Sequence, residues 1–258
     1  MKKYLSVKRL SFVAVFSALS CVLYLFLKFP LPIFPSFLEI NFSMIPIIIC
    51  AFMLGPIDAT VIVIIRFLIK LITISTHTAG VGEIADVIIG GCVAITSGVI
   101  YNYTKFKGKT FISLLSGALV WIIASMISNY FFNIPIYLQL YFGGNEEPLI
   151  GIISTALNTF VKFISFGQAN NIILDSSNYI GYYIWCCVLP FNALLSFIVM
   201  GFTGLVHKKI AVLYDYLGSN KNIKNTKADN AWLFIALFLI MVYDIKIICH
   251  FFVCREWR

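Results

Sequence analysis

Four charged residues sit in otherwise apolar stretches of the chain, at spacings that favour pairing. Arg66 and Lys70 are four residues apart, so on a helix they share one face. Glu83 and Asp86 are three apart and share a face at the start of the next helix. A charge inside a membrane is costly unless a partner neutralises it, so we predict that the basic face meets the acidic face in structural ion pairs. The alternative for Lys70 is that it extends along its helix to the outer membrane surface.

Two motifs place an asparagine near the outer end of an apolar stretch. Asn129 lies in SNYFFNIPIY at 128–137, and Asn192 lies in LPFN at 189–192. A buried amide needs several hydrogen bonds. Two amides at similar depth therefore suit a flat ligand with donors and acceptors along its edges, and amide bonding between helices is the alternative.

Residues for covalent or metal chemistry do not form recognisable sets. The seven cysteines lie in apolar runs without a CxxC or Cys/His spacing, which favours small buried side chains over a metal site or disulfides. His77, His207 and His250 are far apart, and the sequence has no HExxH, GxSxG or P-loop motif. We therefore expect no catalytic residues, no metal and no cofactor, and an intramembrane enzyme is the least favoured class. Because the sequence has no P-loop, any ATP hydrolysis that the function requires would have to come from partner chains.

The composition indicates which elements must position these groups. The chain has 258 residues, 60% hydrophobic and 12% charged, whereas soluble domains are about 25% charged. This excludes a soluble globular protein, a disordered chain and a nucleic-acid binder, and it predicts an all-α integral membrane protein in the lipid bilayer. About 20 apolar residues cross a bilayer as a helix. The predicted spans are 10–26, a short 44–54, 57–75, 84–103, 111–132 and 179–206.

Gly55-Pro56 separates the short second span from the third, and the distribution of charge decides between a kink and a turn. The basic N-terminus, residues 2–9, and the basic loop 104–110 both belong in the cytoplasm by the positive-inside rule. An even number of crossings must lie between them, which a turn provides and a kink does not. The basic segment 207–230 then also lies inside, and the N-terminus is predicted to be cytoplasmic.

The predicted domain organisation has three parts. The six spans form one membrane domain at 1–210, a basic cytoplasmic linker follows at 211–230, and an extra hydrophobic segment occupies 231–258. This last segment contains Asp244 and Lys246. A seventh span and a helix lying in the membrane interface are therefore equally favoured.

The outer loops are richer in chemistry than simple connections. The first, 29–43, holds three prolines and four phenylalanines beside an acid and an amide. The second, 76–83, is rich in glycine, so its backbone can approach a ligand closely. The third, 133–178, has room for a surface helix around 149–166. We predict a lid over an outward-facing pocket, with anchoring of aromatic side chains in the membrane interface as the alternative.

Four segments occur in an order, and with intervening loops, that are typical of one family. They read FPLPIFPSFLEINFSMIPIIICAFMLGP at 29–56, TAGVGEIADVIIGG at 78–91, SNYFFNIPIY at 128–137 and VLPFNALLSFIV at 188–199. They resemble the S components, the substrate-binding membrane subunits of energy-coupling-factor vitamin transporters, and in particular the riboflavin-specific branch. The resemblance implies a six-helix bundle in the cell membrane with a short second helix and both ends cytoplasmic. It also implies docking on a transmembrane coupling subunit that carries two cytoplasmic ATPases.

The resemblance further implies the residues of a riboflavin site. Asn129 and Asn192 match the family's ligand-binding asparagines, which would bond the ring edge and the ribityl hydroxyls while the flavin ring is stacked and buried. The predicted substrate-binding residues are Leu38, Glu39, Asn41, Gly80, Glu83, Asn129, Tyr130, Phe191 and Asn192.

A small-residue motif on the first helix matches the family's docking surface. Ala14 and Ala18 are one turn apart and would leave a groove for close approach of a helix of the coupling subunit. Without the resemblance, an ordinary apolar helix would be the favoured interpretation.

Three departures from the family pattern concern the ligand more than the transport role. Leu195 replaces a lysine that is common three residues after the second asparagine, the outer loop 138–178 is long, and the tail 207–258 adds an apolar segment. Flavin mononucleotide, a riboflavin analogue or another vitamin is therefore an alternative ligand. A secondary transporter acting alone is the other alternative, although the six unequal spans show no inverted repeat.

Overall fold

The computed structural model describes residues 7–35, 37–73, 81–166 and 172–218, with side chains up to Val212. The chain divides into two compact units, Met1–Ala211 and Val212–Arg258. The predicted extra segment at 231–258 lies outside the described residues. The linker predicted from residue 211 onward begins as helix, because the last helix of the structure continues to Gly218.

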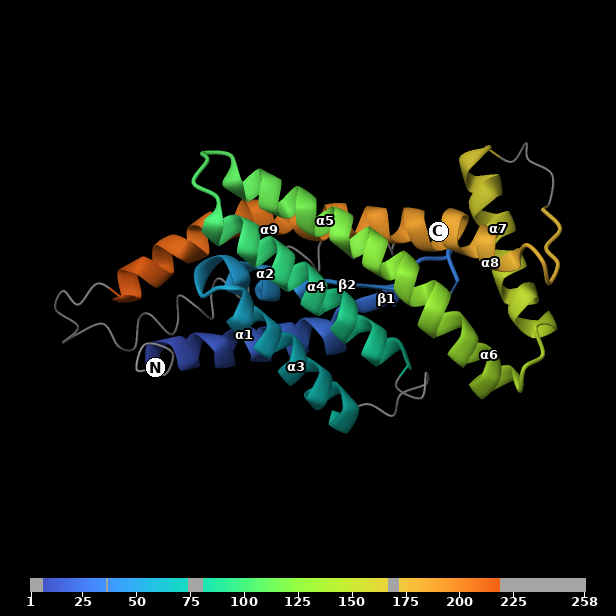
Figure 1. Cartoon of the computed structure of the whole chain (residues 1–258), viewed down its shortest axis with the longest axis horizontal. Coiled ribbons are helices and arrows are strands. Elements are labelled where there is room, and N and C mark those ends of the chain that lie inside the picture. The colour runs from blue at the N-terminus through green and yellow to red at the C-terminus, as the bar shows by residue number, and fades with distance from the viewer. Residues whose placement is uncertain (1–6, 36, 74–80, 167–171, 219–258) are drawn as a thin grey trace, which may run out of the picture. The chain divides into compact units, whose positions relative to one another are not determined.

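Unit 1 is built almost entirely from helices, with one small hairpin between the first two (Figure 1). In chain order the elements are α1 (Val7–Phe26), β1 (Lys28–Pro30), β2 (Glu39–Asn41), α2 (Met44–Met53), α3 (Pro56–Thr73), α4 (Val81–Tyr103), α5 (Lys109–Ser128), the π-helix η1 (Asn129–Asn133), α6 (Ile134–Phe142), α7 (Glu147–Ile164), α8 (Tyr179–Tyr182), the π-helix η2 (Tyr183–Val188) and α9 (Leu189–Gly218).

Among the described residues, five helical stretches are long and apolar enough to cross a membrane. They are α1, α4, continuous α5–η1–α6, α7, and α8–η2–α9 as far as Val212. Helix α3 adds 18 residues that include three charged ones, and α2 adds ten apolar residues. In Figure 1, α1, α4, α5 and α9 run lengthwise, whereas α7 lies across one end of the bundle. The predicted all-α membrane bundle is thus confirmed, with α7 as a further helix where a surface helix was expected.

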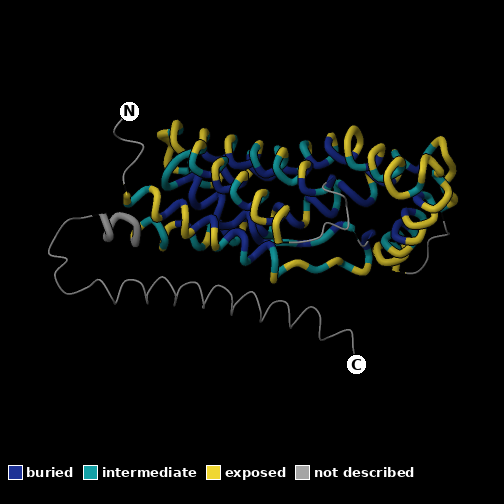
Figure 2. The backbone as a smooth tube through the Cα atoms, turned by 90° about the horizontal axis from the view of Figure 1, so that it is seen from below, coloured by how far each residue is buried: buried dark blue, intermediate teal, exposed yellow. Residues whose placement is uncertain are grey.

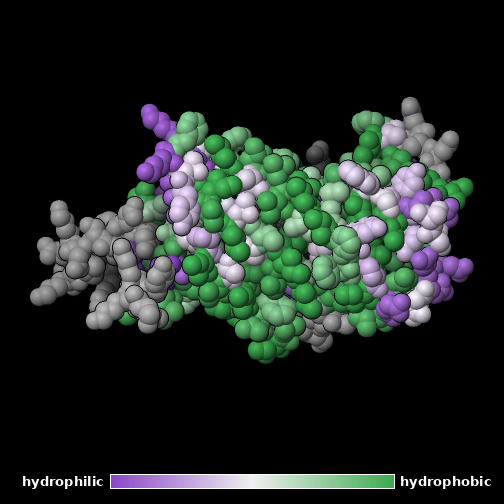
Figure 3. All heavy atoms as spheres, viewed as in Figure 1, coloured by the Kyte–Doolittle hydropathy of each residue, from purple (hydrophilic) through white to green (hydrophobic). Residues whose placement is uncertain are grey.

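The outer faces of the lengthwise helices are apolar. Large hydrophobic side chains such as Ile95, Leu119, Ile123 and Phe197 are exposed on the protein surface, and the core between the helices is buried (Figure 2). On the face shown in Figure 3, hydrophobic side chains cover the middle of the bundle and hydrophilic ones gather towards its ends. A band of this kind is what a hydrocarbon environment requires, and unit 1 is a multi-pass membrane domain.

The predicted turn between the second and third spans is present at Gly55-Pro56. Gly55 has a φ of +110°, a conformation that glycine adopts without steric cost. Pro56 begins α3, where its missing N–H would be unpaired in any case. Arg9 fastens this turn to α1, because its guanidinium forms an ion pair with Asp58 and donates to the Leu54 carbonyl oxygen at 3.1 Å.

Each of the two long composite helices contains a π-helical segment just before a proline. Pro135 follows η1 by two residues, and Pro190 follows η2 by two residues. A proline inside a helix cannot donate to the carbonyl four residues back, so the hydrogen-bond ladder must shift there. The π turns absorb that shift. As a result, one composite helix is widened from Asn129 to Asn133, and the other is widened from Tyr183 to Val188, one turn before Asn192.

The first outer loop folds back on itself as an antiparallel hairpin. Strands β1 and β2 pair with Phe29 opposite Ile40, so the intervening residues 31–38 form its tip. Ile40 in β2 and Phe42 just after it are buried. The tip rests on the transverse helix α7 and on α9 through Phe34, whose ring centroid lies 5.1 Å from that of Phe160 and 5.3 Å from that of Phe191.

Candidate ligand-binding cavity

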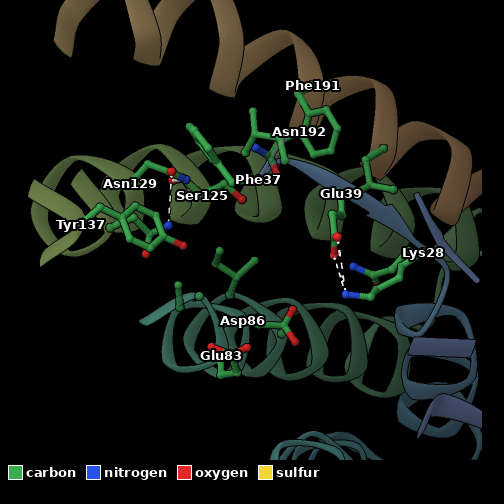
Figure 4. A pocket seen from close by; sticks show the side chains of 18 of the residues that line it. Lys28, Phe37, Glu39, Glu83, Asp86, Ser125, Asn129, Tyr137, Phe191 and Asn192 are labelled. Atoms are coloured by element: carbon green, nitrogen blue, oxygen red, sulfur yellow. Dashed lines mark hydrogen bonds and ion pairs between the residues drawn. The ribbon is translucent and has the colours of Figure 1, made fainter. Parts of the chain in front are cut away.

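A cavity of about 450 Å³ lies in the bundle beneath the hairpin, within the usual range for small-molecule sites. Its walls come from the end of α1, the hairpin, α2, α3, α4, the composite helix α5–η1–α6, α7 and α9. Figure 4 shows Asn129 and Ser125 on one wall, Glu83 and Asp86 on the wall opposite, and Phe191 with Asn192 above.

One wall is a stripe of six side chains from the composite helix, each four residues after the last. An α-helix completes a turn in 3.6 residues, so a spacing of four drifts around the helix by about 40° at each step. The wider π turn of η1 counteracts the drift in the middle of the stripe. The stripe consists of Trp121, Ser125, Asn129, Asn133, Tyr137 and Tyr141.

The two asparagines are held by their own helices and by neighbouring side chains. Asn129 donates to the Ser125 carbonyl oxygen at 2.9 Å, and its Oδ1 accepts from the Tyr183 hydroxyl at 2.9 Å. Asn192 donates to the Val188 carbonyl at 2.8 Å and accepts from the Trp121 indole at 3.2 Å. These bonds fix the orientation of both amides at the cavity wall before any ligand binds, which is the preorganisation that a selective site needs.

Two ion pairs join α3 to α4 at the cavity. Arg66 Nη2 lies 2.7 Å from Asp86 Oδ2, and Lys70 Nζ lies 3.1 Å from Glu83 Oε1. Arg66 is 2% exposed, and both members of the second pair are also buried. Lys70 therefore points inward to an acid and does not extend to the membrane surface.

Further contacts complete the charge network. Arg66 donates to the Ser43 hydroxyl at 2.5 Å, and Lys70 donates to the Tyr24 hydroxyl. At the rim, Lys28 Nζ lies 3.1 Å from Glu39 Oε2 and bridges the two strands of the hairpin. Acids and bases around the cavity are thus arranged in pairs.

Most of the predicted binding residues lie on the cavity wall. They are Leu38, Glu39, Asn41, Glu83, Asn129, Phe191 and Asn192, and they are joined there by Lys70 and Asp86 from the predicted ion pairs. Leu195, the residue in place of the family's lysine, also lines the cavity. Gly80 lies outside the described residues. Ala14 and Ala18 are exposed on α1, away from the cavity.

Tyr130, the remaining predicted binding residue, does not lie on the cavity wall. Its side chain is 52% exposed and packs edge-on against Phe131, with ring centroids 4.9 Å apart. Successive residues of a helix point about 100° apart, and here that rotation turns Tyr130 away from the cavity and onto the protein surface.

Several wall residues were not anticipated from the sequence. Phe37 stands between Tyr137 and Tyr183, with ring centroids 6.1 and 5.9 Å away, and α7 contributes Leu149 and Ile152. The stripe from Trp121 to Tyr141 is visible in the sequence as polar and aromatic residues at every fourth position. A repeat of four does not follow one face of a regular helix, and it becomes meaningful only with the π turn in place.

A membrane bundle with a preorganised, aromatic and amide-lined cavity near one end defines a class: membrane-embedded proteins that bind a small ligand. Comparison with known proteins narrows that class. The model of the family described as "ECF transporter, substrate-specific component" matches residues 8–207. The chain belongs to this family, which confirms the resemblance seen in the sequence.

Individual relatives agree with the family match. The riboflavin transporter RibU of Staphylococcus aureus is 28% identical over 134 residues, which cover 52% of this chain and 69% of RibU. The riboflavin transporter FmnP of Bacillus subtilis is 31% identical over 135 residues, covering 52% of this chain and 70% of FmnP. The solved S component of a bacterial ECF transporter superposes with a TM-score of 0.56 at 21% identity, over 80% of this chain and 96% of that one, which shows a common fold.

Proposed function

We propose that this chain is the riboflavin-binding membrane subunit of an ATP-driven energy-coupling-factor importer. The observation that carries the proposal is the cavity, in which two oriented amides and several aromatic rings meet, in a chain whose relatives are riboflavin transporters. Phe37, Trp121 and Phe191 would bury the isoalloxazine ring, and the amides of Asn129 and Asn192 would bond its polar groups.

The proposal extends to topology and partners. The subunit captures riboflavin on the outer side of the cell membrane, where the hairpin and α7 lie, and its N-terminus is cytoplasmic, as the basic residues at the other end support. Release inside follows docking on a transmembrane coupling subunit that works with two cytoplasmic ATPases. Ala14 and Ala18, exposed on α1, are the proposed contact with that subunit. The chain itself acts as a binding and transport subunit and not as an enzyme.

Purified protein tests the ligand directly. Protein extracted in detergent from cells grown with riboflavin should carry the yellow flavin absorbance band, and protein from riboflavin-starved cells should lack it. Adding riboflavin to the starved preparation should quench tryptophan fluorescence, because Trp121 lies in the cavity wall. A colourless protein whose fluorescence ignores riboflavin would contradict the proposal. Flavin mononucleotide would then be tested next, because Leu195 alters the wall.

The hairpin tip should control how fast the ligand leaves. Phe34 is buried between α7 and α9 but is not part of the cavity wall, so Phe34→Ala loosens the hairpin without removing a ligand contact. Loss of two aromatic pairs should speed riboflavin release about tenfold in a stopped-flow displacement experiment.

Two further variants make this experiment specific. Phe160→Ala removes the partner of Phe34 on α7 and should have a similar effect, with little added by combining the two. Phe163→Ala removes an exposed ring from the same helix and should leave the release rate unchanged. Equal acceleration by all three variants would show that α7, and not the Phe34 contact, determines release.

A further inference from the structure

Four buried polar side-chain atoms have no hydrogen-bond partner among the described residues. They are the hydroxyls of Ser97, Ser125 and Ser128 and the amide oxygen of Asn133. Buried polar groups are seldom left unpaired in native proteins, because their desolvation is then uncompensated. Of these four, Ser125 and Asn133 belong to the cavity wall.

The unused bonding capacity on this wall lies on either side of Asn129. The Oδ1 atom of Asn129 already accepts two hydrogen bonds, from Tyr183 at 2.9 Å and from Asn133 Nδ2 at 3.2 Å. An amide oxygen has two lone pairs, so this acceptor is full. Asn133 has used its nitrogen but not its oxygen, and Ser125 has used neither role of its hydroxyl.

Ser125 lacks the local hydrogen bond that several other hydroxyls buried in helices make. Ser17 donates to the Val13 carbonyl at 2.7 Å, and Thr203 donates to the Val199 carbonyl at 2.8 Å, each four residues back on its own helix. This local bond is the usual way for a helical hydroxyl to be satisfied. Ser125 makes no such bond and is 1% exposed at the cavity wall.

The two unpaired atoms differ in depth and in surroundings. Ser125 and Asn133 are eight residues apart, which is about 12 Å along a helix. Ser125 lies one turn from Trp121, in the part of the wall where Trp121 bonds Asn192. Asn133 lies one turn from Tyr137 and two from Tyr141, whose phenol groups make the wall more polar near α7. A single ligand that reaches both atoms must be long, and riboflavin, with a ring at one end and hydroxyls at the other, has a suitable shape.

We propose that Ser125 and Asn133 are two ligand-binding residues that bind opposite ends of the flavin. The Ser125 hydroxyl donates to a carbonyl oxygen of the ring, and Asn133 Oδ1 accepts a hydrogen bond from a hydroxyl of the ribityl chain. This assignment rests on the proposed function and extends it, because it orients the ring towards Trp121 and the chain towards α7.

Two flavins and two serine variants test the assignment. Lumiflavin has the ring of riboflavin but lacks the ribityl chain. Ser125→Ala should weaken binding of both flavins about five- to tenfold, the effect of one lost neutral hydrogen bond. Ser128→Ala is the matched control, since its hydroxyl is also buried and unpaired on the same helix but does not line the cavity. It should leave both affinities within about twofold of wild type.

Asn133→Ala should weaken the binding of riboflavin by a similar factor and leave the affinity for lumiflavin unchanged. The ligand-free unfolding temperature provides a further readout, and Ser125→Ala should not lower it, because the hydroxyl has no partner in the protein. Any of three results would overturn the assignment. Ser125→Ala and Ser128→Ala could have equal affinities for the flavins, Ser125→Ala could lower the ligand-free unfolding temperature, or Asn133→Ala could lose as much affinity for lumiflavin as for riboflavin. A wild-type protein that binds neither flavin would overturn the proposed function, and this assignment with it.

Discussion

Asn129→Ala should reduce the affinity for riboflavin by about a hundredfold, the largest loss expected from a single change in the cavity wall. The amide of Asn129 forms hydrogen bonds with three neighbouring groups: the Ser125 carbonyl, the Tyr183 hydroxyl and the Asn133 amide. Its removal takes away a ligand contact and also releases the groups that it orients. Two to three neutral hydrogen bonds at about 1 kcal/mol each account for this magnitude. Quenching of tryptophan fluorescence by riboflavin measures it.

A second asparagine provides the control. Asn102 makes the same kind of bond within its helix, to the Gly98 carbonyl at 2.8 Å, and it also bonds the Ala51 carbonyl at 2.9 Å. It is not part of the cavity wall. Asn102→Ala should therefore lower thermal stability without changing affinity for riboflavin. If both variants lose affinity to the same extent, Asn129 acts through the stability of the bundle and not through the site.

Asp86→Asn should strongly destabilise the protein, by about 3 kcal/mol, because it leaves Arg66 buried without its carboxylate. Removing the stranded charge should restore much of the loss. We therefore expect the double variant Arg66→Met with Asp86→Asn to unfold at a higher temperature than Asp86→Asn alone. Thermal unfolding in detergent, followed by circular dichroism, measures both effects.

An exposed ion pair in the hairpin serves as the control for this prediction. Lys28 and Glu39 form an ion pair of similar length, but their side chains are about one-third exposed. Exposed pairs contribute about 0–1 kcal/mol, so Glu39→Gln should change the unfolding temperature little. A double variant no more stable than Asp86→Asn would show that Arg66 is not destabilised by the loss of its partner.

The features that the sequence predicted well depend on local spacing. Residues four positions apart share one face of a helix, so Arg66 and Lys70 were predicted to lie together. Because a lone charge in lipid is costly, acidic residues were expected to face them. The turn at Gly55-Pro56 followed from counting basic loops on the two sides of the membrane. Both arguments need no knowledge of how distant helices pack.

Other features depend on packing or on irregular helix geometry, which spacing rules do not contain. The stripe from Trp121 to Tyr141 needs a π turn to face one cavity, and Tyr130 lies on the protein surface although it directly follows Asn129 in the motif. Helix α7 was expected only as a surface element. Its contribution of Leu149 and Ile152 to the wall depends on docking across the end of the bundle, which its own sequence does not specify.

The paired charges of the cavity have a consequence for the way the membrane voltage acts on the site. Among the described residues that line it, Lys28 and Lys70 are matched by Glu39 and Glu83, and Asp86 is matched by Arg66 directly behind the wall. Moving one charge through a membrane potential of 100 mV changes its energy by about 2.3 kcal/mol. Riboflavin is uncharged at neutral pH, so an occupied cavity carries no net charge from these groups. The voltage across the membrane therefore does no net work on these side chains and their ligand when the loaded site moves.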